Sequence, residues 1–177
     1  SERKKDITLK GFNVYSESAF IDKLHLSYAR MEEEGAFLGS QTSGAFKLRD
    51  ESVTDIFGTM IEKKLNSKLT IYASGYYGST KVYPDVDSLF SDFKTIQSTS
   101  WSLGLLNDEV FRRNDTLGLV VHQPIRADNG SFNLRLPGSA DYKGNIYYKE
   151  QSYSLKPNGR EINYEAFYEI DVDKMKI

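Results

Sequence analysis

Residues 161–170, with the sequence EINYEAFYEI, alternate between an uncharged set of side chains and a set that carries three glutamates. One set of alternate positions carries no charge: Ile162, Tyr164, Ala166, Tyr168 and Ile170. The other set carries Glu161, Glu165 and Glu169. Because successive side chains of a β-strand point to opposite faces, this pattern predicts a strand with one apolar and one acidic face.

Similar alternation recurs through the chain, with turn signals between the candidate strands. The candidate strands are residues 7–15, 23–28, 52–62, 69–83, 94–106, 116–122, 132–136 and 161–170. Residues 65–68 read as a turn, Asp128-Asn129-Gly130 predicts a tight hairpin, and Gln123-Pro124 predicts an interruption of the hydrogen-bond ladder to a neighbouring strand. No helix longer than a turn or two is expected.

This pattern predicts an all-β fold, an antiparallel meander closing into a β-barrel of about eight or more strands. Residues 1–177 would form a single β-barrel domain or a fragment of a larger barrel. Strand periodicity leaves two environments open. In a membrane the uncharged face meets lipid, whereas in a soluble barrel or sandwich it meets a protein core.

Composition excludes several classes of function. A net charge of −2 provides no basic surface for a nucleic-acid backbone. The chain has no cysteine, and His25 and His122 lie far apart, so neither a metal site nor a cofactor is expected. No stretch approaches the roughly 18 apolar residues of a membrane helix. The 12 tyrosines favour a membrane boundary, where an apolar ring with a polar tip is suited to the interface, although tyrosine is also common in half-buried sheets.

The charged residues of the last third suggest a structural network rather than catalysis. If the polar face lines a lumen, desolvation favours pairing of Arg135 and Arg160 with the acidic residues Glu161, Glu165 and Glu169. A catalytic or cation-binding role for the same glutamates is the alternative to this structural network. Ser, His and Asp are present, but no Gly-x-Ser-x-Gly motif is found, so no catalytic residue is assigned and the chain is not expected to be an enzyme.

Several motifs together resemble the C-terminal autotransporter-like β-barrel domain of bacterial subtilisin-like autotransporter proteins. They are residues 101–105 (WSLGL), 115–119 (DTLGL), 123–126 (QPIR), 132–137 (FNLRLP) and 155–162 (LKPNGREI). The resemblance implies a non-catalytic anchor or translocator in the outer membrane of a Gram-negative bacterium. Its partners would be outer-membrane lipid and a covalently linked or associated passenger protein. The end of the chain lacks the terminal aromatic residue of such barrels and resembles a cut inside a larger barrel, so the resemblance implies either a fragment or a barrel completed by another piece.

Two functional hypotheses follow. In the outer-membrane hypothesis, the side chains that face lipid are Leu117, Leu119, Ile162, Tyr164 and Tyr168. The alternative is a soluble periplasmic or extracellular β-barrel or sandwich that binds a ligand or a protein partner. The same side chains then point into its core.

Overall fold

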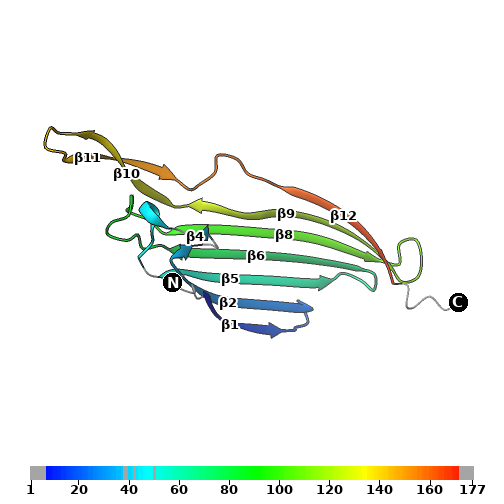
Figure 1. The fold of residues 1–177 in the computed structure, drawn as a ribbon. Coiled ribbons are helices and arrows are strands. Elements are labelled where there is room, and N and C mark those ends of the chain that lie inside the picture. The colour runs from blue at the N-terminus through cyan, green and yellow to red at the C-terminus, as the bar shows by residue number, and fades with distance from the viewer. Residues whose placement is uncertain (1–6, 38–39, 42, 50, 172–177) are drawn as a thin grey trace.

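The structure, a computed structural model, describes residues 7–37, 40–41, 43–49 and 51–171. Its main element is a seven-stranded sheet in the order β1-β2-β5-β6-β8-β9-β12, in which every neighbouring pair is antiparallel (Figure 1). These strands are β1 (Ile7–Ser16), β2 (Lys23–Glu34), β5 (Glu51–Lys64), β6 (Leu69–Lys81), β8 (Ile96–Asp108), β9 (Asp115–Asn129) and β12 (Asn163–Ile170).

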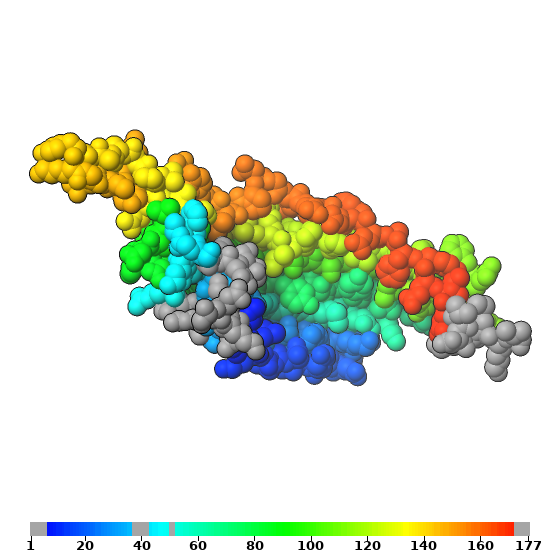
Figure 2. All heavy atoms as spheres, viewed as in Figure 1, coloured from blue at the N-terminus to red at the C-terminus, as the bar shows by residue number. Residues whose placement is uncertain are grey.

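A second sheet of three strands projects from one end of the first (Figures 1 and 2). It consists of β7 (Phe90–Ser91), β10 (Ser131–Ala140) and β11 (Ile146–Ser154). A short pair, β3 (Ala36–Phe37) and β4 (Ser40–Gln41), and a 3-10 turn at Gly44–Phe46 complete the described elements. The all-β prediction is therefore confirmed.

The prediction of a closed β-barrel is wrong. The strands β1 and β12 lie at opposite borders of the seven-stranded sheet and do not pair with each other (Figure 2). Alternation in a sequence determines which side chains share a face, and short turns determine which consecutive strands are neighbours. Neither signal specifies whether the first strand meets the last, because those strands are far apart in the sequence.

The connections between strands differ greatly at the two ends of the sheet. Short turns at residues 17–22, 65–68 and 109–114 lie at one end (Figure 1). The opposite end carries the long connections, residues 35–50, 82–95 and 130–162, and the last of these contains the β10–β11 hairpin. The turn predicted at 65–68 is confirmed: Asn66 Oδ1 accepts the backbone N–H groups of Lys68 and Leu69 at 2.8 and 2.9 Å.

One local prediction is confirmed and one is wrong. The β8–β9 ladder is interrupted at Pro124, which lies opposite a register shift between Thr99 and Trp101, while the strand β9 itself continues through it. A bulge accommodates proline because its missing N–H is not needed there. The turn at Gly130, with φ of 134°, makes no hairpin: β9 pairs with β8 and β12, whereas β10 pairs with β7 and β11.

The buried core is small and lies beside the long connections. Leu48, Val82 and Ile96 form it, and Phe93, Ala127 and Leu155 pack around them. In the part of the chain that the structure describes, the buried hydrophobic side chains are these three and Ala36. The seven-stranded sheet is thus a single layer, and no element of the described residues covers its central strands (Figure 1).

Candidate interaction surface

One face of the seven-stranded sheet is apolar from one border to the other. The strand register aligns one row of side chains directly across β2, β5, β6, β8, β9 and β12: Leu24, Ile61, Ala73, Leu103, Val121 and Tyr164. The same face carries Phe12 and Val14 on β1, and Ala166 and Tyr168 on β12. We call this surface the apolar face.

The side chains of the apolar face are exposed. Leu103 is 50% exposed, Leu119 51% and Tyr164 81%. Two shallow apolar hollows of 710 and 890 Å³ cross the surface. Isolated exposed leucines are common on proteins, but a continuous apolar surface of this extent marks contact with a membrane or another protein.

An aromatic row and then a charged row border the apolar face near the long connections. The aromatic row aligns Phe12, Tyr28, Phe57 and Tyr77 across four strands. The ring centroids of Phe12 and Tyr28 lie 5.6 Å apart, and those of Tyr28 and Phe57 lie 5.0 Å apart. Tyr28 Oη donates a hydrogen bond of 2.7 Å to Asp55 Oδ1, which belongs to the charged row.

On each strand the charged row lies two residues from the aromatic row, on the side of the long connections. It aligns Lys10, Arg30 and Asp55 directly, and Arg30 Nη1 lies 3.8 Å from Asp55 Oδ1. Toward the short turns the apolar face meets a second ionic contact, in which Lys63 Nζ lies 3.7 Å from Asp22 Oδ2. Charged contacts therefore limit the apolar face at both ends of the first strands.

The opposite face, which we call the polar face, carries hydroxyl groups, glycine and carboxylates, together with apolar side chains such as Leu9, Met60 and Leu106. The hydroxyls of Ser74 and Ser102 lie 2.8 Å apart, and those of Thr54 and Thr80 lie 3.0 Å apart. The side chain of Asn163 is 3.3 Å from His122 Nε2 in the same register row as Ser102. Cross-strand pairs of this kind satisfy polar groups within the sheet itself.

Three glycines of the polar face lie under aromatic rings from the neighbouring strand. The ring of Tyr72 covers Gly104, that of Tyr76 covers Gly58, and that of Phe167 covers Gly118. A Cβ atom added at any of these glycines overlaps the ring. Glycine is required at these positions because the ring occupies the space of a side chain, and the ring in turn covers exposed backbone.

The residues of the predicted polar network are distributed over separate parts of the structure. Glu165 and Glu169 share the polar face of β12, opposite Val120 and Thr116. Arg160 and Glu161 precede β12 in the chain, and Arg135 lies in the projecting sheet opposite Glu150, with its guanidinium 5.5 Å from the centre of the Tyr148 ring.

Across residues 7–37, 40–41, 43–49 and 51–171, no ion pair joins either of these arginines to Glu161, Glu165 or Glu169. The nearest ionisable partner of Glu165 is His122, whose Nδ1 lies 3.7 Å from Glu165 Oε1. Of the lipid-facing set predicted from the sequence, the register places Leu117, Leu119, Tyr164 and Tyr168 on the apolar face, and Ile162 precedes β12.

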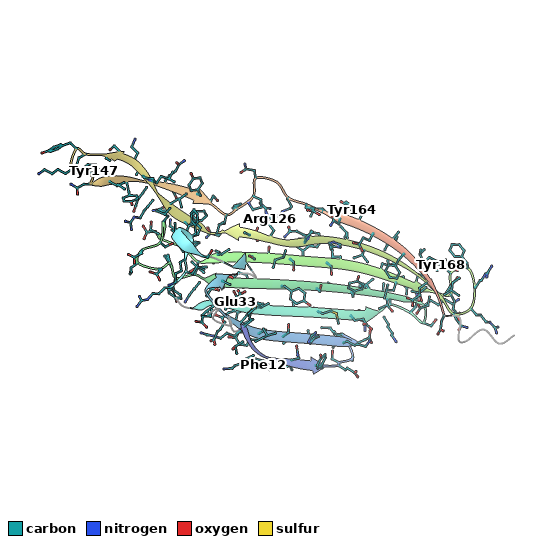
Figure 3. All side chains as sticks on the ribbon, in the orientation of Figure 1. Phe12, Glu33, Arg126, Tyr147, Tyr164 and Tyr168 are labelled. Atoms are coloured by element: carbon teal, nitrogen blue, oxygen red, sulfur yellow. The ribbon has the colours of Figure 1, made fainter. Side chains whose placement is uncertain are left out.

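Two residues that organise the surface, Asp115 and Arg126, were not predicted to do so. Asp115 is 1% exposed, and its carboxylate accepts the backbone N–H groups of Val110, Phe111 and Arg112 at 2.7 to 3.0 Å. Tyr168 Oη also donates to it at 2.7 Å, which joins the β8–β9 turn to β12. Figure 3 shows Tyr168 on β12. The only sequence signal was an aspartate that closes an Arg-Arg-Asn turn.

Arg126 holds the segment that returns from β11 to β12. Its Nη2 donates a hydrogen bond of 3.0 Å to the carbonyl oxygen of Pro157. The contact fixes the chain just before β12 begins, and Figure 3 shows Arg126 close to this returning segment. An arginine that follows a strand proline gives no signal of such a contact in the sequence.

The described residues contain no group of three or more His, Asp and Glu side chains arranged to hold a metal ion. No helix in the same residues has the length and apolarity needed to cross a membrane. No family model, curated protein or solved structure matches the chain. The resemblance to subtilisin-like autotransporters therefore stays a prediction from the quoted motifs.

Proposed function

We propose that this chain is a non-catalytic outer-membrane anchor or translocator component, whose seven-stranded sheet lies in the membrane with its apolar face against lipid. The observation that carries the proposal is the apolar face itself, which is continuous from β1 to β12 and exposed. In water such a surface is unfavourable by about 25 cal/mol for each Å² of apolar area. Contact with acyl chains removes that cost.

The height of the apolar face fits this environment. On β6 it extends from Leu69 to Tyr77. Together with its aromatic border at Tyr77, this span lies at the lower end of the about 9 to 11 residues that a tilted transmembrane β-strand needs. The apolar band of outer-membrane β-proteins is bordered by aromatic residues. Phe12, Tyr28, Phe57 and Tyr77 supply such a border, with Arg30 and Asp55 beyond it.

The connections and the polar face add support. Outer-membrane strands are joined by short turns on the periplasmic side and long loops on the outer side. The connections at the two ends of this sheet differ in the same way, so in this proposal the β10–β11 hairpin lies on the outer side. A polar face of serine, threonine and covered glycine is suited to an aqueous interior that stays away from lipid.

The borders of the sheet impose a condition on this function. In lipid every backbone N–H and C=O must be paired, because each unpaired group costs several kcal/mol. The outer edges of β1 and β12 therefore pair with strands beyond those of the described sheet when it is in a membrane. A passenger protein, attached to this chain or associated with it, is the cargo that a translocator would carry.

The soluble alternative places a protein partner on the apolar face. The two apolar hollows, one lined by Ile61, Ala73 and Leu103 and the other by Phe12 and Phe57, favour it because side chains of a partner layer can fill them. In this alternative the chain acts in the periplasm or outside the cell, and the partner buries the leucines that lipid would otherwise cover.

Partition between water and lipid tests the proposal. Residues 1–177 are refolded by dilution from urea into buffer, with or without phosphatidylcholine vesicles, and the vesicles are then floated through a density gradient. We expect β-structure by circular dichroism and a heat-modifiable gel band only in the floated fraction. A monodisperse, β-rich protein that remains at the bottom of the gradient would overturn the proposal and favour the soluble alternative.

A further inference from the structure

We infer that the outer edge of β12 pairs with an extended segment that runs antiparallel to β12 and alternates apolar residues with lysine or arginine. The inference goes beyond the proposed function, because it holds whether the apolar face meets lipid or protein.

The edge of β12 is open and regular. β12 pairs with β9 from Asn163 to Ile170 without a register shift. No strand of the described residues lies on its other side (Figure 1). Proteins usually protect such edges with charged side chains, proline or a bulge, since the free N–H and C=O groups recruit other strands. β12 has neither proline nor a bulge, and its charged residues, Glu165 and Glu169, are both acidic, so its edge is suited to pairing with a basic strand.

The apolar face continues to this edge without a polar border. Tyr164 is 81% exposed and Tyr168 is 45% exposed, and both lie along the border strand in Figure 3. A further strand with apolar side chains on this face extends the surface, and its side chains pack against both tyrosine rings. Aromatic and β-branched residues make the most favourable cross-strand pairs with tyrosine.

Charge on the other face defines the second half of the pattern. Glu165 and Glu169 both point to the polar face, and the residues opposite them on β9 are Val120 and Thr116, which carry no charge. The side chain of Glu165 is 60% exposed. A partner strand with lysine or arginine opposite these glutamates gains two favourable pairs, whereas like charges placed directly opposite are destabilising.

The opposite border of the sheet does not offer the same pattern. The edge strand β1 has Lys10 and Phe12 on the apolar face, and its polar-face residues, which include Leu9 and Asn13, carry no acidic side chain. A strand that alternates apolar and basic residues therefore meets complementary charge at β12 and none at β1. This difference makes β1 the internal control for the inference.

A peptide based on β9 tests the inference, because β9 already pairs antiparallel with β12 on its inner side. The probe copies residues 115–122 with Thr116→Lys, Val120→Lys and Leu119→Cys, so that the lysines face Glu169 and Glu165 in the β9 register. A second peptide carries Thr116→Glu and Val120→Glu instead. The chain has no cysteine, so Ala166→Cys, opposite position 119, provides a single site for disulfide capture.

We expect the lysine peptide to form the disulfide roughly fivefold more than the glutamate peptide, as two cross-strand charge pairs allow. The preference should disappear with Glu165→Gln and Glu169→Gln, and Val14→Cys on β1 should show none. All variants are compared as full chains in the medium in which the chain folds, with circular dichroism as the control of folding. If Ala166→Cys does not fold, Tyr164→Cys is paired with a peptide that carries Val121→Cys.

Three outcomes contradict the inference. The first is equal capture of both peptides at β12, and the second is equal capture at β12 and β1. The third is a predominance of disulfide-linked dimers of the Ala166→Cys chain over peptide adducts, which shows that a second copy occupies the edge. None of these outcomes depends on whether the chain binds vesicles, so the inference and the proposed function fail separately.

Discussion

The seven-stranded sheet and the projecting β7–β10–β11 sheet use alternating apolar residues in opposite ways. In the projecting sheet, Phe132 packs against Phe90, Phe93 and Tyr153, with ring centroids 5.2 to 5.7 Å apart. In the seven-stranded sheet, Leu119 follows a similar alternation and is half exposed. Similar periodicity thus gives a half-buried aromatic cluster in one region, and in the other an exposed apolar surface for which we propose a partner from outside the described residues.

The largest expected effect separates the two faces of β9. Leu119→Arg places a charge on the apolar face, and in a membrane it should lower the free energy of unfolding by about 2 to 4 kcal/mol. Its neighbour provides the matched control, because Val120→Arg points to the polar face opposite Glu165. Urea titration of vesicle-bound protein measures both variants. Equal losses from the two arginines would show that lipid does not distinguish the faces.

Shortening an aromatic side chain of the projecting sheet should lower the free energy of unfolding in any medium. Phe132→Ala removes the ring that joins Phe90, Phe93 and Tyr153, and we expect a loss of about 2 kcal/mol, below the range for a fully buried phenylalanine because Phe132 is half-buried. The same loss should appear in detergent and in vesicles, measured by urea titration. A loss that changes strongly between the two media would mean that this cluster is not a core formed by the protein alone.

Replacing a glycine of the polar face by alanine should lower the free energy of unfolding by a smaller amount. Gly118→Ala should cost about 1.5 kcal/mol, because its Cβ overlaps the ring of Phe167. Gly159→Ala is the control, since no atom lies within 4 Å of an added Cβ at that position. The double variant Gly118→Ala, Phe167→Ala should show less than the sum of its single losses in a double-mutant cycle. Strict additivity would contradict the contact.

The smallest expected effect is a pH dependence at the tip of the β10–β11 hairpin. Hydrogen bonds from the side chain and backbone of Asn145, together with the backbone N–H of Lys143, hold the pKa of Asp141 below its ordinary value of 3.8. Because the folded pKa is lowered, this turn is stabilised above pH 3.8 and loses the stabilisation as the pH falls through the folded value.

Amide exchange at Lys143 and Asn145 measures this effect. We expect protection of both amides to decrease as Asp141 becomes protonated, and Asp141→Ala should remove the pH dependence. The amides of β9 and β12 serve as the control, because they are distant from this turn. Unchanged protection at the hairpin tip through the titration of Asp141 would contradict the assigned hydrogen bonds.

The sequence predicts most strands of the large sheet because their alternation is local. The segment EINYEAFYEI correctly separates Tyr164 and Tyr168 from Glu165 and Glu169, as the β9–β12 register shows. The prediction of closure failed because pairing between β1 and β12 would join distant segments, about which alternation carries no information. The strand β11 was not predicted, since its sequence IYYKEQSYS does not alternate cleanly.

The contacts that organise the candidate surface were harder to predict from the sequence. The carboxylate of Asp115 closes a turn and also accepts the hydroxyl hydrogen of Tyr168 from a strand 53 residues away. The placement of Arg135 in a separate sheet follows from the change of sheet at Gly130, which the sequence signals only as a turn. Such contacts depend on which strands become neighbours, and residue type alone does not determine that.

The lone tryptophan tests the central claim, that the apolar face contacts lipid, most directly. Trp101 lies on the apolar face, in one register row with Gly75 and Gln123. Fluorescence is compared in vesicles of ordinary phosphatidylcholine and of phosphatidylcholine brominated on its acyl chains, with acrylamide as the quencher in water. We predict strong quenching of Trp101 by the brominated chains and weak quenching by acrylamide. Full quenching by acrylamide and none by bromine, in folded protein bound to vesicles, would contradict the account.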